Sequence, residues 1–324
     1  CALPICKKFT KEICDASGAP TANYAVFDSH ESAKAYIKTQ GAPLVVKADG
    51  LAAGKGVIVA TDIEMALSAV DEIFDGSFGD AGASVVIEEF MEGEEASLFV
   101  LVDGETVLPI GTAQDHKRVG EGDTGLNTGG MGAYSPAPIL SEAVLNKTMD
   151  RIIRPTVREM VNRGMPFTGV LYAGLMIKDS NPRLVEYNVR FGDPECQVLM
   201  MRLGGQILDA LLSTAKGELI DVKLNWADDH AITVVMASDG YPGSYTNGSQ
   251  INGLADLPSN SNFMCFHAGT AKEDGNIISN GGRVLNITAR SETLFEAQKN
   301  AYEIIEIIDW PEGFYRKDIG WRAL

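Results

Sequence analysis

The sequence predicts an α/β (α+β) protein with a small α/β unit, a central mixed region and a β-rich C-terminal domain. Apolar runs typical of strands alternate with helical patterns over about residues 20–92. Two hairpin patterns and one long amphipathic pattern follow in residues 93–225. From about residue 228, short strand patterns alternate with turns rich in Gly, Asn and Ser. The 324 residues suffice for about two domains of ordinary size.

Three helices and three strands are predicted in residues 1–92. A helical pattern at residues 7–16 ends at Gly18, a residue that tolerates the left-handed conformation of a helix C-terminus. Two later helices are expected behind residue pairs that are spaced as capping boxes. The pairs are Asp28 with Glu31, for a helix ending at Gly41, and Thr61 with Glu64, for a helix ending near Phe74. Strands are predicted at residues 43–47, 57–60 and 84–88.

Two hairpins and a long helix are predicted next. The first hairpin turns at Asp103 and Gly104, a pair favoured in tight turns, and the second is expected to turn at Asn181 and Pro182. The hairpin strands are predicted at residues 96–102, 106–110, 168–178 and 183–188, and the helix at residues 141–163. In the C-terminal domain, strands are predicted at residues 231–237, 263–268 and 283–289 and a helix at residues 292–308.

The composition disfavours several classes of protein. The formal net charge of -17 argues against a general nucleic-acid binder, because nucleic-acid phosphates repel an acidic protein. No apolar run approaches the roughly 20 residues that a membrane span needs. The five cysteines are scattered, which argues against a disulfide framework or a zinc site and favours a reducing, cytoplasmic location.

The first candidate site is a glycine-rich segment with two lysines. Lys47 ends a predicted strand, and Gly50, Gly54, Lys55 and Gly56 follow it. Glycine lets backbone N–H groups approach phosphate oxygens, and lysine supplies positive charge. The spacing fits neither a Walker A loop nor a dinucleotide-binding fingerprint. The segment predicts a loop that covers phosphates, and the alternative is a glycine-rich turn with solvated lysines.

The second candidate site is an acidic turn that follows a buried strand. It contains Glu88, Glu89, Phe90 and Met91, and Glu95 comes shortly after. Backbone groups at such a strand end can pair with adenine, and a carboxylate can accept hydrogen bonds from ribose hydroxyls. The alternative is an exposed acidic loop.

The most specific candidate is a strand that carries a carboxylate, an amide and an arginine at alternate positions. Side chains at i, i+2 and i+4 of a strand share a face, so Glu186, Asn188 and, if the strand continues, Arg190 point the same way. Carboxylate and amide oxygens suit a Mg²⁺ ion that bridges phosphates. Arginine suits a phosphoryl group in transfer. The alternative is a face of cross-strand salt bridges.

The fourth candidate is a polar, glycine-rich stretch near the middle of the chain. It includes Asp115 and, towards its end, Thr128, Gly129, Gly130 and Met131. Long structured loops of this kind are usually functional. Backbone N–H groups in such a loop can hold a small zwitterion or a phosphate, and the alternative is a flexible surface connection.

Together these motifs resemble the ATP-grasp ligases, and most closely the phosphoribosylamine–glycine ligase family. The family's strings match KADGLAAGKGV at residues 47–57, IEEFMEGEEAS at 87–97, QDHKR at 114–118, NTGGMGAYSP at 127–136 and EYNVRFGDPE at 186–195. The resemblance implies an ATP-grasp fold. Its expected parts are a remnant linker and helix at 1–22, a small lid subdomain at 23–92, a central mixed-sheet catalytic subdomain at 93–225 and a β-rich C-terminal domain at 226–324.

The resemblance also implies residue roles toward ATP and the metal ion. ATP phosphates would be bound by Lys7, Lys47, Gly50, Gly54, Lys55 and Gly56. Adenine would be lined by Glu88, Glu89, Phe90 and Met91, and the ribose held by Glu95. Mg²⁺ (or Mn²⁺) would be ligated by Glu186 and Asn188. The catalytic residues would be Arg190 and Lys55.

For the other substrates, the resemblance implies contacts with glycine and 5-phosphoribosylamine from Asp115, Thr128, Gly129, Gly130, Met131 and Arg190. The implied reaction joins these substrates through glycyl phosphate and gives glycinamide ribonucleotide, ADP and phosphate in de novo purine biosynthesis. Alternatives are another ATP-grasp carboxylate–amine ligase, a carboxylase component or an inactive ATP-binding fragment. No nucleic-acid or membrane partner is expected, and the chain is expected to be a monomer.

The sequence departs from the family's usual pattern at three places. Ile5 and Cys6 precede Lys7 where the family usually has Gly-Ser, and Leu126 stands where Pro is usual. The family also carries an N-terminal, dinucleotide-fold-like domain of about 100 residues, to which nothing in this sequence corresponds. Since the chain begins at Cys1 rather than Met, we expect a fragment or a processed form.

Overall fold

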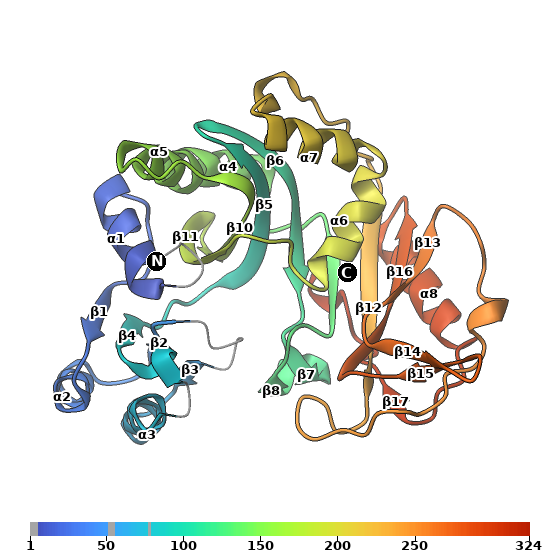
Figure 1. Ribbon diagram of the computed structural model, residues 1–324, viewed down its shortest axis with the longest axis horizontal. Coiled ribbons are helices and arrows are strands. Elements are labelled where there is room, and N and C mark those ends of the chain that lie inside the picture. Colours follow the sequence, from blue (N-terminus) through green and yellow to red (C-terminus); the bar gives the residue numbers. More distant parts are fainter. Residues whose placement is uncertain (1–5, 51–55, 77–78) are drawn as a thin grey trace. The chain divides into compact units, whose positions relative to one another are not determined.

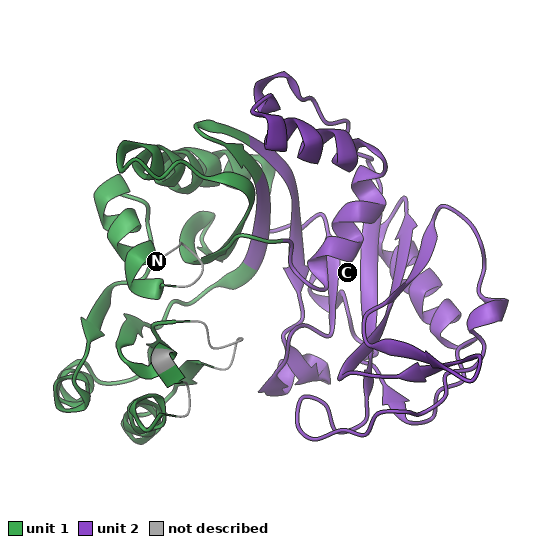
Figure 2. Cartoon of the chain, in the orientation of Figure 1, with its two compact units in different colours: residues 1–95, 101–107, 141–190 green, residues 96–100, 108–140, 191–324 purple. Residues whose placement is uncertain are grey.

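The computed structural model describes residues 6–50, 56–76 and 79–324 (Figure 1). These residues divide into two compact units, which Figure 2 distinguishes by colour. Unit 1 comprises residues 1–95, 101–107 and 141–190, and unit 2 comprises residues 96–100, 108–140 and 191–324. The domain boundaries at residues 22, 92 and 225 stay predictions.

Unit 1 contains a four-stranded antiparallel sheet in the order β1-β4-β2-β3. Its strands are β1 (Tyr24–Phe27), β2 (Leu44–Ala48), β3 (Val57–Ala60) and β4 (Val85–Glu89). One face is covered by α2 (His30–Gln40) and α3 (Ile63–Phe74), whose apolar residues form a core with Val46 and Ile87. Because strand side chains alternate, Lys47 and Glu88 lie on the opposite face.

The two predicted capping boxes were each wrong by one residue. The residue that precedes α2 is Ser29, not Asp28, and its side chain makes no capping hydrogen bond. The N-cap of α3 is Asp62, not Thr61, and its carboxylate accepts a hydrogen bond from the Met65 N–H at 2.8 Å. A capping side chain reaches the N–H three residues later, so the true cap directly precedes the first helical residue.

The other helices of unit 1 are α1 (Lys7–Ser17), α4 (Glu142–Thr148) and α5 (Arg154–Asn162). α1 ends at Gly18 with a φ of 71°, as predicted. The long helix predicted at residues 141–163 is present, but α4 and α5 are joined by a π-helical turn at Met149–Ile153. Pro155 explains this turn, because proline has no N–H and its ring crowds the carbonyl four residues earlier.

Unit 1 also contains the hairpin of β10 (Thr168–Lys178) and β11 (Asn181–Asn188). The predicted turn at Asn181 and Pro182 was wrong, because the chain turns two residues earlier. Asp179 and Ser180 both adopt the left-handed conformation, with φ angles of 51° and 58°, as a type I′ turn requires. Pro182 lies within β11, which ends the strand order of its sheet, and an edge strand tolerates proline.

Strands β5 (Glu94–Asp103) and β6 (Thr106–Asp115) form the other predicted hairpin and contribute residues to both units. Unit 2 continues the strand order as β6-β9-β12-β16-β13, and β17 pairs with β12. These strands are β9 (Gly132–Ser135), β12 (His230–Ser238), β13 (Phe263–His267), β16 (Arg283–Ser291) and β17 (Gly313–Phe314). Nearly every residue of β12 is buried, because α8 (Leu294–Ile305) and α6 (Glu195–Leu203) both pack on it.

Smaller elements complete unit 2. Two short hairpins are formed by β7 (Arg118–Gly120) with β8 (Thr124–Asn127) and by β14 (Thr270–Glu273) with β15 (Asn276–Ser279). Helix α7 (Gln206–Lys216) follows α6. Within the described part of the chain, no helix has the length and apolar character needed to cross a membrane.

Candidate active site

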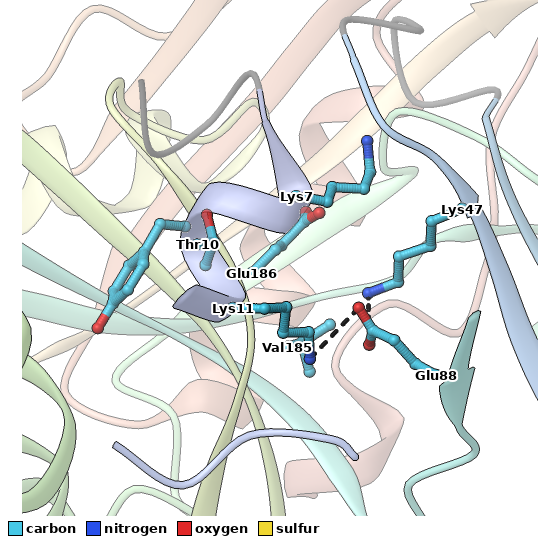
Figure 3. A pocket seen from close by; sticks show the side chains of 8 residues that line it. Lys7, Thr10, Lys11, Lys47, Glu88, Val185 and Glu186 are labelled. Carbon is cyan, nitrogen blue, oxygen red and sulfur yellow. Dashed lines mark hydrogen bonds and ion pairs between the residues drawn. The ribbon is translucent and has the colours of Figure 1, made fainter. Parts of the chain in front are cut away.

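A small cavity in unit 1 brings together four of the predicted site residues (Figure 3). Its lining comes from α1, β2, β4 and β11 and comprises Lys7, Thr10, Lys11, Lys47, Glu88, Val185, Glu186 and Tyr187. The predicted residues among these are Lys7, Lys47, Glu88 and Glu186. Segments that are far apart in the sequence therefore meet at one place, as the motif interpretation requires.

Glu88 lies at the centre of an ion-pair group in this cavity. Its carboxylate accepts a hydrogen bond from Lys47 Nζ at 2.9 Å and forms an ion pair with Lys11 Nζ at 3.3 Å. Glu88 is 3% exposed and Lys11 is 2% exposed. Because two lysines share one carboxylate, the group has an excess of positive charge, and burial lowers the pKa of Lys11 below its ordinary value. An anionic ligand would compensate this charge.

Lys7 adds a further ammonium group to the cavity. Its Nζ donates to the Gly50 carbonyl at 3.2 Å. Burial lowers the pKa of Lys7, although the nearby charge of Glu186 acts in the opposite direction. Lys7 and Lys11 are four residues apart on α1, so they share a face of the helix. The sequence interpretation missed Lys11, and this spacing within a predicted helix was the signal that could have found it.

Glu186 and Asn188 lie on one face of β11, as predicted. Asn188 Nδ2 donates to Glu186 Oε1 at 3.4 Å. Glu186 lines the cavity together with the lysines, and this hard-oxygen pair fits a divalent cation that carries phosphates. Among the described residues, no group of three or more His, Cys, Asp or Glu could hold a metal ion, so phosphate and water oxygens would supply the other ligands. β11 ends at Asn188, as predicted, so the strand does not continue to place Arg190 on this face.

The residues predicted for adenine and ribose, apart from Glu88, do not line this cavity. Glu89 forms an ion pair with Arg183, Phe90 is 40% exposed, and Met91 is buried. Glu95 lies on β5. Their roles toward the nucleotide stay predictions.

The glycine-rich loop is described at its two ends only. A Cβ on Gly50 would lie 2.6 Å from the Cβ of Ala81, so glycine alone fits there. The Gly56 carbonyl accepts a hydrogen bond from the Ala48 N–H at 2.8 Å and so closes the connection between β2 and β3. The predicted phosphate contacts Gly54 and Lys55 lie outside the described residues.

In unit 2, the predicted substrate loop at residues 128–131 uses all four of its N–H groups internally. The N–H groups of Thr128, Gly129, Gly130 and Met131 donate, in this order, to Lys117 O (2.7 Å), Tyr241 Oη (3.0 Å), Thr128 Oγ1 (2.9 Å) and His116 O (2.8 Å). The expected cradle of open backbone donors is therefore not formed by these residues. The loop is instead a rigid part of unit 2, and its substrate role stays a prediction.

His116 anchors a charged cluster beside this loop. The ring is fully buried, and its Nε2 accepts a hydrogen bond from the Gly320 N–H at 2.9 Å, which leaves the proton on Nδ1. Nδ1 lies 3.5 Å from Asp123 Oδ1, and Asp123 also pairs with Arg316 (2.9 Å) and Arg322 (2.6 Å). Burial lowers the pKa of His116, and the His116 ring and the Arg316 guanidinium lower the pKa of Asp123. This neutral, buried imidazole holds β7 and β8 to the C-terminal segment.

The neighbouring Asp115, also predicted to face substrate, lies at the end of β6. Its carbonyl accepts a long hydrogen bond of 3.4 Å from Arg322 Nη1. The substrate role of Asp115 stays a prediction.

Comparison with known proteins identifies two matching family models. Residues 6–196 match the model described as "Phosphoribosylglycinamide synthetase, ATP-grasp (A) domain". Residues 231–322 match the model described as "Phosphoribosylglycinamide synthetase, C domain". Together these matches cover most of the chain.

Two relatives with similar sequences have the same name. A Brucella melitensis biotype 1 protein named phosphoribosylamine–glycine ligase is 57% identical over 318 residues, which are 98% of this chain and 74% of that protein. A chloroplastic phosphoribosylamine–glycine ligase of Arabidopsis thaliana is 55% identical over 328 residues, covering 100% of this chain and 62% of that protein.

Solved structures confirm the predicted ATP-grasp fold. The Thermotoga maritima phosphoribosylamine–glycine ligase superposes with a TM-score of 0.89 at 33% identity, over 97% of this chain and 78% of that chain. The biotin carboxylase domain of a Hydrogenobacter thermophilus 2-oxoglutarate carboxylase, solved with MgADP, superposes with a TM-score of 0.73 at 16% identity. The match covers 97% of this chain and 68% of that chain. The second similarity concerns the fold alone.

Proposed function

The chain belongs to the phosphoribosylglycinamide synthetase family, and from this premise we propose that it ligates glycine to 5-phosphoribosylamine at the expense of ATP. The products are glycinamide ribonucleotide, ADP and phosphate. The observation that carries the proposal is the cavity of unit 1, in which Lys7 and Lys47 lie beside Glu186.

The chemistry of the reaction explains why these residues are needed. A carboxylate is a poor acyl donor, because its leaving group would be oxide, so ATP first converts glycine to glycyl phosphate. The amine of phosphoribosylamine then attacks this acyl group and releases phosphate. Catalysis of this kind depends mainly on positioning and on neutralising phosphate charge. Lys7 and Lys47 supply that charge, and Arg190 with Lys55 is assigned to the transferred phosphoryl group.

ATP-grasp membership implies ATP and a divalent cation as cofactors, and we propose Mg²⁺ (or Mn²⁺) as the working ion. Glu186 and Asn188 would hold it through their side-chain oxygens. When bound, the ion neutralises phosphate charge and orients the phosphates.

The remaining assignments are parts of the same proposal. Residues 23–92 act as a lid that excludes water, which would otherwise hydrolyse glycyl phosphate. Residues 93–225 form the catalytic subdomain, and residues 226–324 form the C-terminal domain. The protein works in the cytoplasm as a monomer on small-molecule substrates.

The first test is ADP release from Mg²⁺ATP and glycine, with and without phosphoribosylamine generated in situ. We expect ADP release that needs both substrates, with glycinamide ribonucleotide as the product. Product formation with a different carboxylate or amine would point to another ligase of the same fold. ATP binding without any turnover would contradict ligation by this chain.

A further inference from the structure

Arg283, at the start of β16, joins two of the motifs that carry the family resemblance. Its Nη1 donates to the carbonyls of Gly129 (2.8 Å), Gly130 (3.3 Å) and Asp193 (2.6 Å). Its Nη2 donates to Asp193 Oδ2 at 2.8 Å. The side chain is only 20% exposed. Charge-assisted hydrogen bonds of this kind are about twice as strong as neutral ones.

The two glycines are packed so closely that the loop has one arrangement. A Cβ on Gly129 would lie 2.7 Å from the guanidinium carbon of Arg283. Gly130 has a φ of 112°, and a Cβ there would overlap the Pro194 ring. The Gly129 N–H donates to Tyr241 Oη at 3.0 Å. Residues distant in the sequence therefore fix both polar backbone groups of Gly129.

We propose that Arg283 is a positioning residue for the ligation, which holds the loop at residues 128–131 and the turn at Asp193 in a single working arrangement. The inference rests on the proposed function and on the sequence-based prediction that this loop contacts glycine and phosphoribosylamine. The hydrogen bonds of its guanidinium end on the protein's own atoms, so Arg283 acts by holding the loop and the turn. Its removal changes how the substrates bind but leaves the nucleotide site of unit 1 intact.

The test compares Arg283→Met with Arg290→Met. Arg290 is a matched control, since it lies on the same strand, pairs with Asp229 at 2.8 Å and donates to the Met201 carbonyl at 2.9 Å. We expect Arg283→Met to lower kcat/KM for glycine about 10- to 100-fold, the range expected when hydrogen bonds to a charged group are lost. The KM for ATP stays within about twofold. Arg290→Met changes neither kcat/KM for glycine nor the KM for ATP. Arg283→Lys recovers part of the kcat/KM that Arg283→Met loses.

Amide hydrogen exchange gives a readout that does not depend on turnover. In Arg283→Met, the peptide that contains residues 128–131 exchanges about tenfold faster or more, because the carbonyls of Gly129 and Gly130 lose their donor. In Arg290→Met the exchange of this peptide is unchanged. If Arg283→Met does not fold, Arg283→Lys is measured against the wild type instead, because it keeps the charge and loses the forked geometry.

The outcomes separate the inference from the function on which it rests. Unchanged exchange, or unchanged glycine kinetics in a folded and active Arg283 variant, would overturn the positioning role. Equal losses in the Arg283 and Arg290 variants would also overturn it, because they would reflect a general loss of structure. A wild-type chain without ligase activity would refute the proposed function alone, and the exchange comparison would still decide whether Arg283 holds the loop.

Discussion

Among single residues, Glu88 determines how much positive charge the cavity of unit 1 presents. Lys11 takes part of its carboxylate, so Lys47 is not needed to neutralise it fully. Because Lys11 also pairs with Glu88, Lys47 can turn to a phosphate without leaving this buried carboxylate unpaired. An unpaired buried carboxylate would cost several kcal/mol. Lys11 is thus a positioning residue that sequence motifs did not indicate.

Replacing Lys11 with Met tests this arrangement. Glu88 would then depend on Lys47 alone, and the cavity would lose one positive charge. We expect the KM for ATP to rise about tenfold, equivalent to about 1.4 kcal/mol, with a smaller change in the KM for glycine. Steady-state kinetics at several ATP concentrations measure this, with Lys8→Met as the control, because Lys8 is exposed. A folded Lys11→Met enzyme with the wild-type KM for ATP would contradict the shared-carboxylate argument.

Glu186→Gln tests the metal assignment. The change keeps the shape of the side chain and removes the charge that a hard cation prefers. We expect the Mg²⁺ concentration for half-maximal activity to rise about tenfold or more, and kcat to fall about 10²- to 10³-fold. Glu92→Gln serves as the control, since Glu92 is an exposed carboxylate of the same unit that pairs with Lys178. Normal Mg²⁺ activation of Glu186→Gln would exclude Glu186 as a ligand.

Buried His116 gives the protein a predictable sensitivity to acid. Its pKa is lower in the folded chain than the ordinary 6.5, so below about pH 6.5 the unfolded chain binds more protons. The contribution of His116 to the free energy of unfolding is therefore largest above pH 6.5 and falls as the pH drops towards the folded-state pKa, by at most about 1.4 kcal/mol per pH unit.

His116→Gln removes this titration and keeps an acceptor for the Gly320 N–H. Urea unfolding at several pH values between about 5 and 7 measures the effect. We expect the variant to show a flatter dependence of unfolding free energy on pH than the wild type. If the unfolding free energy of the two proteins depends on pH equally, other groups cause the loss of stability in acid.

Residues with a local signal were predictable, and residues with distant partners were not. Lys47 and Glu186 were found because a strand and its alternation place them. Lys11 carried a weaker signal, its helical spacing from Lys7. For Arg283, no local signal indicated its partners, because it contacts Gly129 across 154 positions and Asp193 across 90. Only the folded sheet brings these three together.

For the elements, the type I′ turn of the β10–β11 hairpin offers a direct test of backbone strain. Ser180 adopts a φ of 58°, where glycine meets no steric cost and other residues do. We expect Ser180→Gly to raise the unfolding free energy by about 0.5–1 kcal/mol in urea titrations. Gly104→Ala gives the opposite test, since Gly104 has a φ of 60° and free space around it. Gly104→Ala should lower the unfolding free energy by about 1 kcal/mol. A higher unfolding free energy in this variant would refute the strain argument.

Most elements could be predicted because each has a local cause. Apolar runs gave β3 at its observed bounds, and Gly18 and Gly41 gave the ends of α1 and α2. The errors also have physical reasons. Asn181-Pro182 is a common turn pair, but the left-handed geometry fell on Asp179 and Ser180. To predict the π-helical turn, the disturbance that Pro155 causes within a helix would have to be weighed against the long apolar face, which favours a continuous helix.

For the whole molecule, the net charge of -17 destabilises the folded state through self-repulsion, although it also favours solubility. Salt screens this repulsion over distances longer than about 8 Å at physiological ionic strength. We expect the midpoint of thermal unfolding to rise as NaCl is increased from low to physiological concentration. Calorimetry in a weakly binding buffer measures this, and a midpoint that falls with salt would show that surface ion pairs outweigh the repulsion.

The close packing of Gly129 on Arg283 and of Gly130 on Pro194 limits which mutations the chain can accept. Alanine at position 129 displaces the guanidinium, and a shorter side chain at position 283 leaves two carbonyls without their donor. Neither step is neutral alone, and their effects do not add. In a saturation library, positions 129 and 283 would therefore show strong epistasis. Evolutionary drift can pass through these positions only by changes made in pairs.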